Sequence, residues 1–330
     1  MFLLKFFITI LVISTLLFLK SIFKLSVHKK RVERVLENQS VRKIVDCGTI
    51  KSLSILPLVD YYAETDSYET EAGVAYYITA DDTDILLDLG ANYKKKHPSV
   101  LMRNMQTAGK QVRDLDFIYL SHIHLDHVGG MRDQRNKTFS FSAGEVELPD
   151  MPVYSPEPVN PSKYNPGPVP VILTEPKKIS DGIISIGAIP RALYLMGYTL
   201  ENSLAFNVEG KGIVVVIGCG HQSIVRILDR VSLLFDEPLY GIIGGLHLPA
   251  GSGRMKIGPI DVQSLVGIDR PPWNGINRSD TEAAVAAVKD AAPSFIALSP
   301  HDSSDWTIQR FKDEFGEKYH DLKVGLPLNI

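Results

Sequence analysis

Residues 121–127 constrain this chain more than any other segment. They read Ser-His-Ile-His-Leu-Asp-His and directly follow the apolar run 117–120, so three imidazoles and a carboxylate gather where a predicted strand ends. Burying such a cluster is unfavourable unless a positive charge compensates it, and a divalent metal does so through ligand types that zinc prefers. With nine His in 330 residues, three within six positions is improbable by chance. The segment therefore predicts a metal centre at a sheet edge.

Three further strand-like runs end close to residues of the same kinds. Asp88 and Gly90 close the run that begins at Ile85, the run 213–217 leads into Gly218-Cys219-Gly220-His221, and the run 295–299 leads to His301. His247 lies within a second motif, Gly244-Gly245-Leu246-His247-Leu248. We expect several strand ends to converge on one site.

These motifs resemble those of the metallo-β-lactamase superfamily, from about Leu53 to the end of the chain. The resemblance implies an α+β fold, the αββα metallo-β-lactamase sandwich, here preceded by an N-terminal transmembrane helix. It implies that His122 and His124 bind one metal ion, while Asp126 and His127 bind a second.

The resemblance also implies roles for two residues outside that segment. His301 is expected to bind metal, and Asp88 is expected to support the ligands from the second coordination shell without binding metal itself. After His301 the chain reads Asp302-Ser303, where the most similar branch more often has Cys-Thr, which puts the shape of the adjoining pocket in doubt.

One departure from the superfamily pattern lies between His127 and His221. No His occurs from residue 128 to residue 220, and Cys219 stands where the metal-bridging Asp is expected. We expect His221 to be the replacement ligand of the first metal, although a polar loop His is the alternative. Cys219 is either a bridging or nearby thiolate, because a metal deprotonates a coordinating thiol, or a small buried hydrophobe. His247 is expected to bind either metal or substrate.

The Gly-Cys-x-His and Gly-Gly-x-His-Leu pair resembles a branch described as metal-dependent hydrolases or as similar to dihydropterin-ribofuranosylaminobenzene phosphate synthase. We therefore expect a hydrolase with two divalent ions, zinc first and iron or manganese as alternatives, that uses a metal-bound hydroxide on an ester, lactone or phosphodiester-type small molecule. Asp126 would both bind metal and orient the nucleophile. The alternatives are a synthase-type transferase acting on a pterin or phosphosugar precursor, and a non-catalytic metal-binding sensor.

The N-terminal segment is a second strong signal. Residues 2–19 are apolar apart from Lys5 and three hydroxyl residues, and 18 helical residues span about 27 Å, close to the roughly 30 Å hydrocarbon core of a bilayer. A cleaved signal peptide is the alternative, but no small-x-small site follows the apolar run. We expect an anchor over residues 1–28, a basic linker over 29–48 with a short helix at 32–38, and a catalytic domain over 49–330.

Charge gives the expected topology and partners. The first 34 residues carry seven Lys and Arg against one Glu, which leaves 28 Lys and Arg against 37 Asp and Glu in the remainder. The positive-inside rule then predicts a single-pass membrane protein with a cytoplasmic catalytic domain. The two cysteines lie far apart in unlike sequence contexts, which disfavours a disulfide and agrees with a reducing compartment. His28 belongs to the basic flank and is not expected to bind metal. The acidic chain after residue 34 disfavours nucleic acid as a partner. We therefore expect a small-molecule substrate.

Local patterns predict the remaining elements. Strands are expected at 53–59, 74–79 and 84–89, the last two as a hairpin, with a second hairpin at 204–208 and 213–217 and a helix at 99–108. A capping box at Ser279-Asp280-Thr281-Glu282 predicts a helix over 283–289. Nine of the 20 prolines lie between Pro149 and Pro176, which excludes a helix or a central strand there. That segment is either a surface excursion or a lid that contains Tyr154 and Tyr164, and residues 249–278 form a second excursion that could line the pocket.

Overall fold

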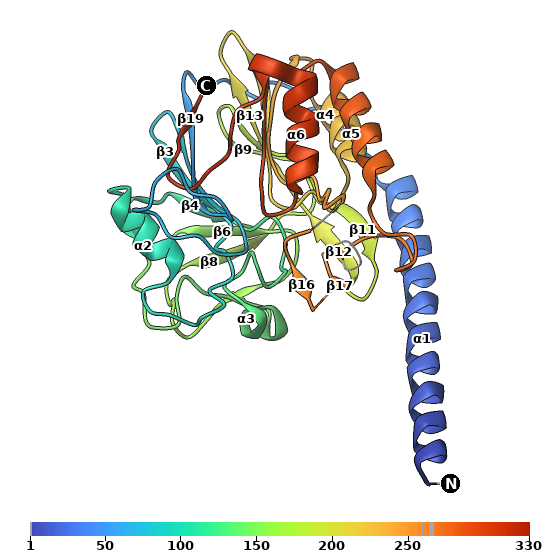
Figure 1. Cartoon of the computed structure of the whole chain (residues 1–330). Helices are drawn as coiled ribbons and strands as arrows, with labels where there is room; N and C mark the ends of the chain where they lie inside the picture. Colours follow the sequence, from blue (N-terminus) through green and yellow to red (C-terminus); the bar gives the residue numbers. More distant parts are fainter. Residues whose placement is uncertain (1, 252, 259, 264–266) are drawn as a thin grey trace.

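Two β-sheets packed face to face form the centre of the computed structural model, which describes residues 2–251, 253–258, 260–263 and 267–330 (Figure 1). The first sheet has the order β19 (Leu328–Asn329), β1 (Leu53–Val59), β2 (Ala75–Ala80), β3 (Thr83–Leu87), β4 (Phe117–Tyr119), β6 (Pro152–Ser155), β8 (Val169–Ile172). The second has the order β18 (Phe295–Leu298), β15 (Leu239–Gly244), β14 (Gly212–Ile217), β13 (Leu204–Val208), β10 (Ile183–Ser185), β9 (Lys177–Ser180).

Helices and short hairpins surround the sheets. The helices are α1 (Phe2–Asn38), α2 (Val100–Thr107), α3 (Met131–Asn136), α4 (Ile224–Leu234), α5 (Arg278–Ala291) and α6 (Asp305–Phe315), with 3-10 turns at Val112–Asp114 and Gly316–Lys318. Two-stranded pairs are formed by β11 (Ile189–Leu193) with β12 (Gly197–Glu201), β16 (Lys256–Ile257) with β17 (Ile260–Asp261), and β5 (Thr138–Phe139) with β7 (Asn160–Pro161).

Three apolar layers hold these elements together. Alternate residues of β2 face opposite ways, so Tyr76 and Ile78 lie between the sheets while Tyr77 packs toward Leu101 of α2. The outer face of the second sheet packs against α4, α5 and α6 through residues such as Val215. This order of helix, sheet, sheet, helix is the predicted αββα sandwich.

The predicted strands and hairpins are present with small shifts in their ends. The pairs β2–β3 and β13–β14 are antiparallel, as expected. In contrast, β3 pairs with β4 in parallel. In the second sheet, β15 lies between β14 and β18 and pairs in parallel with each of them. Parallel strands bring their carboxyl ends to the same sheet edge, so the residues that follow them lie together.

The helix α1 is continuous from Phe2 to Asn38, so the expected short helix at 32–38 is its C-terminal end and not a separate element. Leu25 and Val32 of α1 are buried against Ala192 and Tyr194 of the β11–β12 hairpin. The part from residue 5 to 20 is exposed, and the helix is long and apolar enough to cross a membrane. Figure 1 shows α1 passing along one side of the body, with its N-terminal half extending beyond it.

The proline-rich segment contradicts the expectation that it holds no central strand. Strand β6 lies between β4 and β8 and pairs with both in parallel. Proline is tolerated because Pro152 is the first residue of β6, while Pro170 lies in β8 at the edge of the sheet. The ring of Tyr154 packs edge-on against Phe117, with centroids 5.3 Å apart, so this tyrosine is part of the core and not of a lid.

The cap of α5 also differs from the expectation. The N-cap is Asn277 and its reciprocal partner is Asp280, so the capping box starts two residues before Ser279. Asn277 Oδ1 accepts a hydrogen bond from the amide of Ser279 at 2.9 Å, and Asp280 accepts one from the amide of Asn277 at 2.9 Å. Asn277 with Asp280 and Ser279 with Glu282 are both a polar residue followed three positions later by an acid. The helix uses the first of these two pairs.

Candidate metal centre

The candidate metal centre lies at the edge where the sheets present their strand ends. Asp88 follows β3 and the His-rich segment follows β4. From the second sheet, Cys219 and His221 follow β14, His247 follows β15 and His301 follows β18. All of the sequence-predicted site residues are therefore brought to one place, and all except Asp126 are buried.

Two groups of potential ligand atoms form within this place, and Cys219 belongs to both. The first group consists of His122, Cys219 and His221, and the second consists of His127, Cys219 and His301. In each group the ligand atoms all lie within 4.8 Å of one another. Three imidazole or thiol donors at such separations suit a zinc-type ion.

His124 and Asp126 flank these groups. The ring centroid of His124 lies 4.4 Å from that of His122 and 5.1 Å from that of His221, on the side of the first group. Asp126 Oδ2 lies 3.0 Å from His301 Nε2, on the side of the second. The assignment of the two residues to different ions remains a prediction that agrees with this arrangement.

The donor set fits a metal, as one atom in particular indicates. His122 is fully buried, and its Nδ1 contacts the hydroxyl of Ser121 at 2.9 Å, while its Nε2 is buried without a hydrogen-bond partner among the described residues. A buried polar atom without a partner is costly, and coordination to a cation removes that cost.

Asp88 accepts hydrogen bonds from Ser121 and from the candidate ligand His127. Its Oδ1 accepts the amide hydrogen of Ser121 at 2.8 Å, and its Oδ2 accepts from the Ser121 hydroxyl at 2.7 Å and from His127 Nδ1 at 2.6 Å. Donation from Nδ1 leaves the Nε2 lone pair of His127 facing Cys219 Sγ, 2.9 Å away. These contacts suit the supporting role predicted for Asp88.

His301 is held in a different tautomer. The amide of Gly73 donates to its Nδ1 at 3.0 Å, so the ring carries its proton on Nε2 and donates it to Asp126. A metal ligand must offer a lone pair, so His301 can bind metal only after that proton has left Nε2.

The electrostatics divide the imidazoles of the cluster into two sets. Burial lowers the pKa of His124 to about 4, and burial together with His127 and His124 lowers the pKa of His122 well below its usual value. Burial would raise the pKa of Asp126, but the hydrogen bond from His301 and the nearby imidazoles hold it well below the usual range. Burial would also lower the pKa of His127 and His301, but Asp88 raises that of His127, and Asp302 with Asp126 raises that of His301 to about 9. His122 and His124 therefore favour the neutral, metal-binding form beside an ionised Asp126.

Cys219 shows the same preference. Its thiol is 2% exposed, and burial raises the thiol pKa, an effect that Asp302 and Asp126 reinforce. Without a cation the thiol stays protonated, and a coordinated cation reverses this order by stabilising the thiolate.

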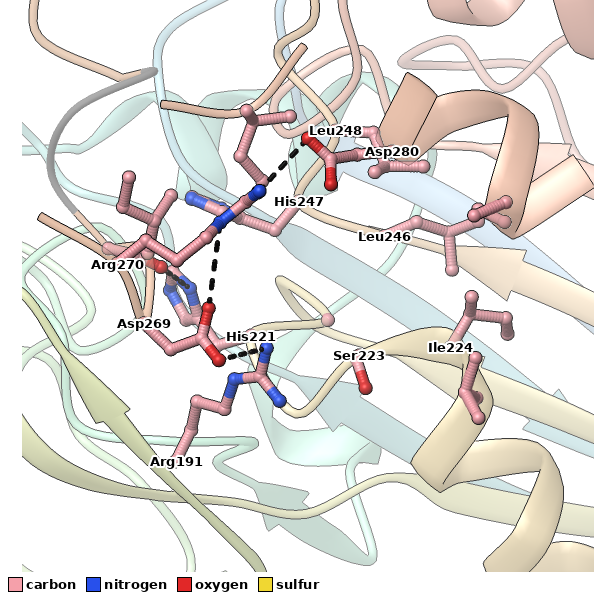
Figure 2. A pocket seen from close by; sticks show the side chains of 17 residues that line it. Arg191, His221, Ser223, Ile224, Leu246, His247, Leu248, Asp269, Arg270 and Asp280 are labelled. Carbon is pink, nitrogen blue, oxygen red and sulfur yellow. Dashed lines mark hydrogen bonds and ion pairs between the residues drawn. The ribbon is translucent and has the colours of Figure 1, made fainter. Parts of the chain in front are cut away.

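His247 belongs to neither ligand group. Its Nδ1 contacts Asp302 Oδ1 at 3.2 Å, and its Nε2 is buried with no hydrogen-bond partner among the described residues. Figure 2 shows His247 and His221 in the wall of a cavity of about 160 Å³, with Arg191 and Arg270 also lining it. His247 (φ 48°) and Asp88 (φ 59°) both have left-handed backbones at strand ends, a conformation that non-glycine residues adopt at a cost.

Sequence reasoning missed two buried acids of this site. Asp302 is 2% exposed and lies against Gly245, where a Cβ would come within 2.4 Å of the Gly218 carbonyl oxygen and 2.7 Å of Asp302 Oδ2, which explains a glycine in the Gly-Gly-x-His motif. Glu201 accepts the amide hydrogens of Cys219 at 3.0 Å and of Gly220 at 2.8 Å, and burial raises its pKa to about 7. For Glu201, the signal in the sequence was a single acid within an otherwise uncharged run. For Asp302, it was the position directly after His301, where the most similar branch more often has Cys.

Comparisons with known proteins agree with this architecture. The family model of the anti-Pycsar protein Apyc1 matches residues 65–148, which include the His-rich segment. The 7,8-dihydropterin-6-methyl-4-(β-D-ribofuranosyl)-aminobenzene-5'-phosphate synthase of Methanocaldococcus jannaschii is 23% identical over 263 residues, which cover 69% of this chain and 88% of that protein. Among solved structures, Tm1679, a metal-dependent hydrolase of the β-lactamase superfamily, superposes with a TM-score of 0.57 at 19% identity, covering 84% of this chain and 99% of that one.

Proposed function

Because this chain has the metallo-β-lactamase fold, as its motifs predicted, we propose that it is a metal-dependent hydrolase with two divalent ions, zinc first and iron or manganese as alternatives. The observation that carries the proposal is Cys219, which belongs to two separate groups of potential ligand atoms. A thiol shared in this way takes the place of the bridging carboxylate expected in the superfamily.

The proposed ligands divide between the two ions. The first would be held by His122, His124 and His221, the second by Asp126, His127 and His301, with Cys219 between them. His221 Nδ1 contacts the carbonyl oxygen of Gly267 at 3.2 Å, which leaves its Nε2 free to bind metal. Asp88 does the same for His127.

Such ions, when bound, lower the pKa of a water and polarise a scissile carbonyl or phosphoryl oxygen. Asp126, with an ionised carboxylate, would orient the attacking water. His247 lines the cavity with a free Nε2 and would contact the substrate rather than the metal. Ester, lactone and phosphodiester-type small molecules are the substrate classes that this chemistry suits, and the acidic body disfavours nucleic acid.

Membrane attachment through α1 is part of the proposal. The exposed apolar segment of α1 belongs to a helix that continues into the body, where Leu25 and Val32 are buried. Continuity of the helix past Lys20 supports an uncleaved anchor over a removable signal peptide. The basic residues after the apolar run support a cytoplasmic catalytic domain.

The first test is elemental analysis of the purified full-length protein in detergent, paired with hydrolysis assays on a generic phosphodiester, an ester and a lactone. We expect about two metal ions per chain and turnover of one of these substrates. His124→Ala is expected to lose metal and activity together, whereas His97→Ala, a change at an exposed histidine outside both groups, should keep both. Full activity in the His124→Ala protein would refute the hydrolase proposal.

The synthase alternative is supported by the relative from Methanocaldococcus jannaschii. Two bound metals without hydrolysis would establish the alternative, provided that the protein transfers the pterin group of an activated dihydropterin ester to a ribofuranosylaminobenzene phosphate, with release of the ester's leaving group and a proton from the acceptor. Two bound metals with neither reaction, in a protein that still binds a small ligand saturably, would indicate a sensor.

A further inference from the structure

One loop connects the metal centre to the N-terminal helix. The carbonyl oxygen of Gly267 contacts His221 Nδ1 at 3.2 Å. Its φ of +80° and a Cβ that would come within 3.1 Å of the His247 ring both favour glycine here. The next residue, Ile268, accepts the amide hydrogen of Tyr194 at 2.6 Å. Tyr194 lies at the end of the β11–β12 hairpin that packs on α1. The loop therefore links His221 to the hairpin and, through it, to the helix.

The same loop reaches the apolar part of α1 directly. Trp273 is 68% exposed, and its ring centroid lies 5.7 Å from that of Phe18. In Figure 1 this orange segment before α5 lies beside α1, and the N-terminal part of the helix extends past it, away from the body. Leu195, in the turn of the hairpin, is 59% exposed and lines a groove with Leu17 and Lys20. We call Leu195, Trp273 and Phe18 the apolar rim.

The apolar rim has the composition of a membrane-contacting surface. Tryptophan is enriched at the boundary between hydrocarbon and headgroups, and the rim lies at the end of the segment long enough to cross a bilayer. Lys20 and Lys24 are exposed beside it and suit anionic headgroups. The rest of the body is acidic, so this basic and apolar side is the one that an anionic membrane attracts.

The cavity beside the metal centre opens among the same elements. Its inner wall is apolar, with Ile224, Leu246 and Ile268 next to His221 and His247. Its outer part carries three linked ion pairs, as Figure 2 shows: Arg191 with Asp269 at 2.8 Å, Arg270 with Asp269 at 3.9 Å and Arg270 with Asp280 at 3.0 Å. Ile268, Asp269 and Arg270 belong to the loop that carries Trp273, and Arg191 belongs to the hairpin that carries Leu195. An apolar wall inside a charged mouth suits an amphiphilic ligand.

From these contacts we propose that the apolar rim rests in the surface of a lipid bilayer, and that the metal centre takes an amphiphilic substrate from that surface. The substrate class is an ester or phosphodiester that carries an apolar chain, with the chain entering the cavity beside His221 and His247. This inference rests on the proposed hydrolase function and on anchoring by α1. It goes further in naming where the substrate comes from and which residues contact the membrane.

Fluorescence quenching tests the rim without relying on activity. The chain has two tryptophans, so Trp306→Phe leaves Trp273 alone and Trp273→Phe leaves Trp306 alone. In vesicles of phosphatidylcholine and phosphatidylglycerol, lipids spin-labelled near the headgroup should quench Trp273 strongly and Trp306 weakly. Equal quenching of the two residues by lipid, or quenching of Trp273 by aqueous acrylamide alone, would overturn the proposal.

Kinetics test the source of the substrate. For Leu195→Ser with Trp273→Ser, the rate on a long-chain ester or phosphodiester in vesicles, divided by the rate on a soluble short-chain analogue, should fall about tenfold because two apolar contacts with the bilayer are lost. Leu233→Ser, at an exposed leucine of α4 outside the rim, should leave that ratio unchanged. An unchanged ratio in the double variant contradicts a rim that delivers substrate. No turnover of either substrate by the metal-loaded wild type contradicts the hydrolase function instead, while the quenching result still decides the rim.

Discussion

Cys219 replaces a hard carboxylate by a soft thiol at the point shared by both ligand groups. Thiolate ligands favour zinc, copper(I) and iron over magnesium, calcium and manganese, so in the proposed centre Cys219 would bias which metal is retained. Without a cation the Cys219 thiol is buried and its pKa is raised, so the metal-free thiol is a poor target for oxidants.

Cobalt substitution tests the role of Cys219. A thiolate bound to cobalt(II) produces a ligand-to-metal charge-transfer band in the near ultraviolet, so we expect that band in the wild type and its loss in Cys219→Ser. The matched control is Cys47→Ser, since Cys47 is the second free cysteine, is buried and contacts Asn207 outside both groups. A band of full intensity in Cys219→Ser would show that the thiol does not bind metal.

The buried carboxyl group of Asp60, which lies outside both ligand groups, makes the stability of the fold depend on pH. Burial raises its pKa to about 6, and the carboxylate accepts hydrogen bonds from Ser299 at 2.7 Å and from the amide of Tyr61 at 2.6 Å. A raised carboxyl pKa means that the folded state favours the protonated form. The stabilisation is complete below about pH 4 and is lost as the pH rises to about 6.

We therefore expect the free energy of unfolding of the wild type to fall relative to that of Asp60→Asn between pH 4 and pH 6, by up to about 3 kcal/mol. Urea unfolding at several pH values measures it. Parallel curves for the two proteins would show that the Asp60 carboxyl has the same pKa in both states.

At the residue scale, the sequence located the candidate ligands more completely than the residues that contact them. The His-rich segment, Cys219 and His221 stand at strand ends in a spacing that a single motif can reveal. Asp302 and Glu201 could not be placed, because their partners are His247 and backbone amides from other strands. Such contacts exist only once the second sheet has formed.

The start of α5 shows how a helix chooses between two overlapping capping frames. Asn277 offers its side chain to the amide of Ser279, and Asp280 returns a hydrogen bond to the amide of Asn277. Replacing an N-cap asparagine by alanine removes a partner from an end amide and costs about 1 kcal/mol. We expect that loss in Asn277→Ala, measured by urea unfolding, and a change within about 0.5 kcal/mol in Ser279→Ala. A larger loss of stability in Ser279→Ala than in Asn277→Ala would show that Ser279 is the N-cap, as the sequence predicted.

At the element scale, apolar runs bounded by turn residues located β1, β2, β3, β13 and β14 because at least one face of each strand is buried. The pattern failed for β6 and β8, where proline suggested irregular chain. Proline excludes a strand only where its missing N–H would be needed. Pro152 opens β6 and Pro170 lies on the edge strand, which sequence alone does not reveal.

At the scale of the whole molecule, α1 serves two structural purposes along its length. Its N-terminal part is exposed and apolar, while Leu25 and Val32 cover Ala192 and Tyr194 of the β11–β12 hairpin. Deleting residues 2–19 is therefore expected to move the protein from the membrane fraction to the soluble fraction with its metal content unchanged. Deleting residues 2–38 should in addition lower the Tm, because it exposes that apolar contact to water. Equal Tm values for the two deletions would mean that the contact adds no stability.

The ligands of the candidate centre are contributed by distant parts of the chain. Asp126 and His301, which contact each other, are 175 residues apart, and the two sheets contribute to both ligand groups. A site of this kind has high contact order, so it forms only when nearly the whole chain has folded. Metal binding therefore reports complete folding. An ion bound only by the native state stabilises that state against global unfolding and so protects the chain against proteolysis. Local unfolding of either sheet would release the ion. Metal content is thus a measure of how much of a preparation is correctly folded.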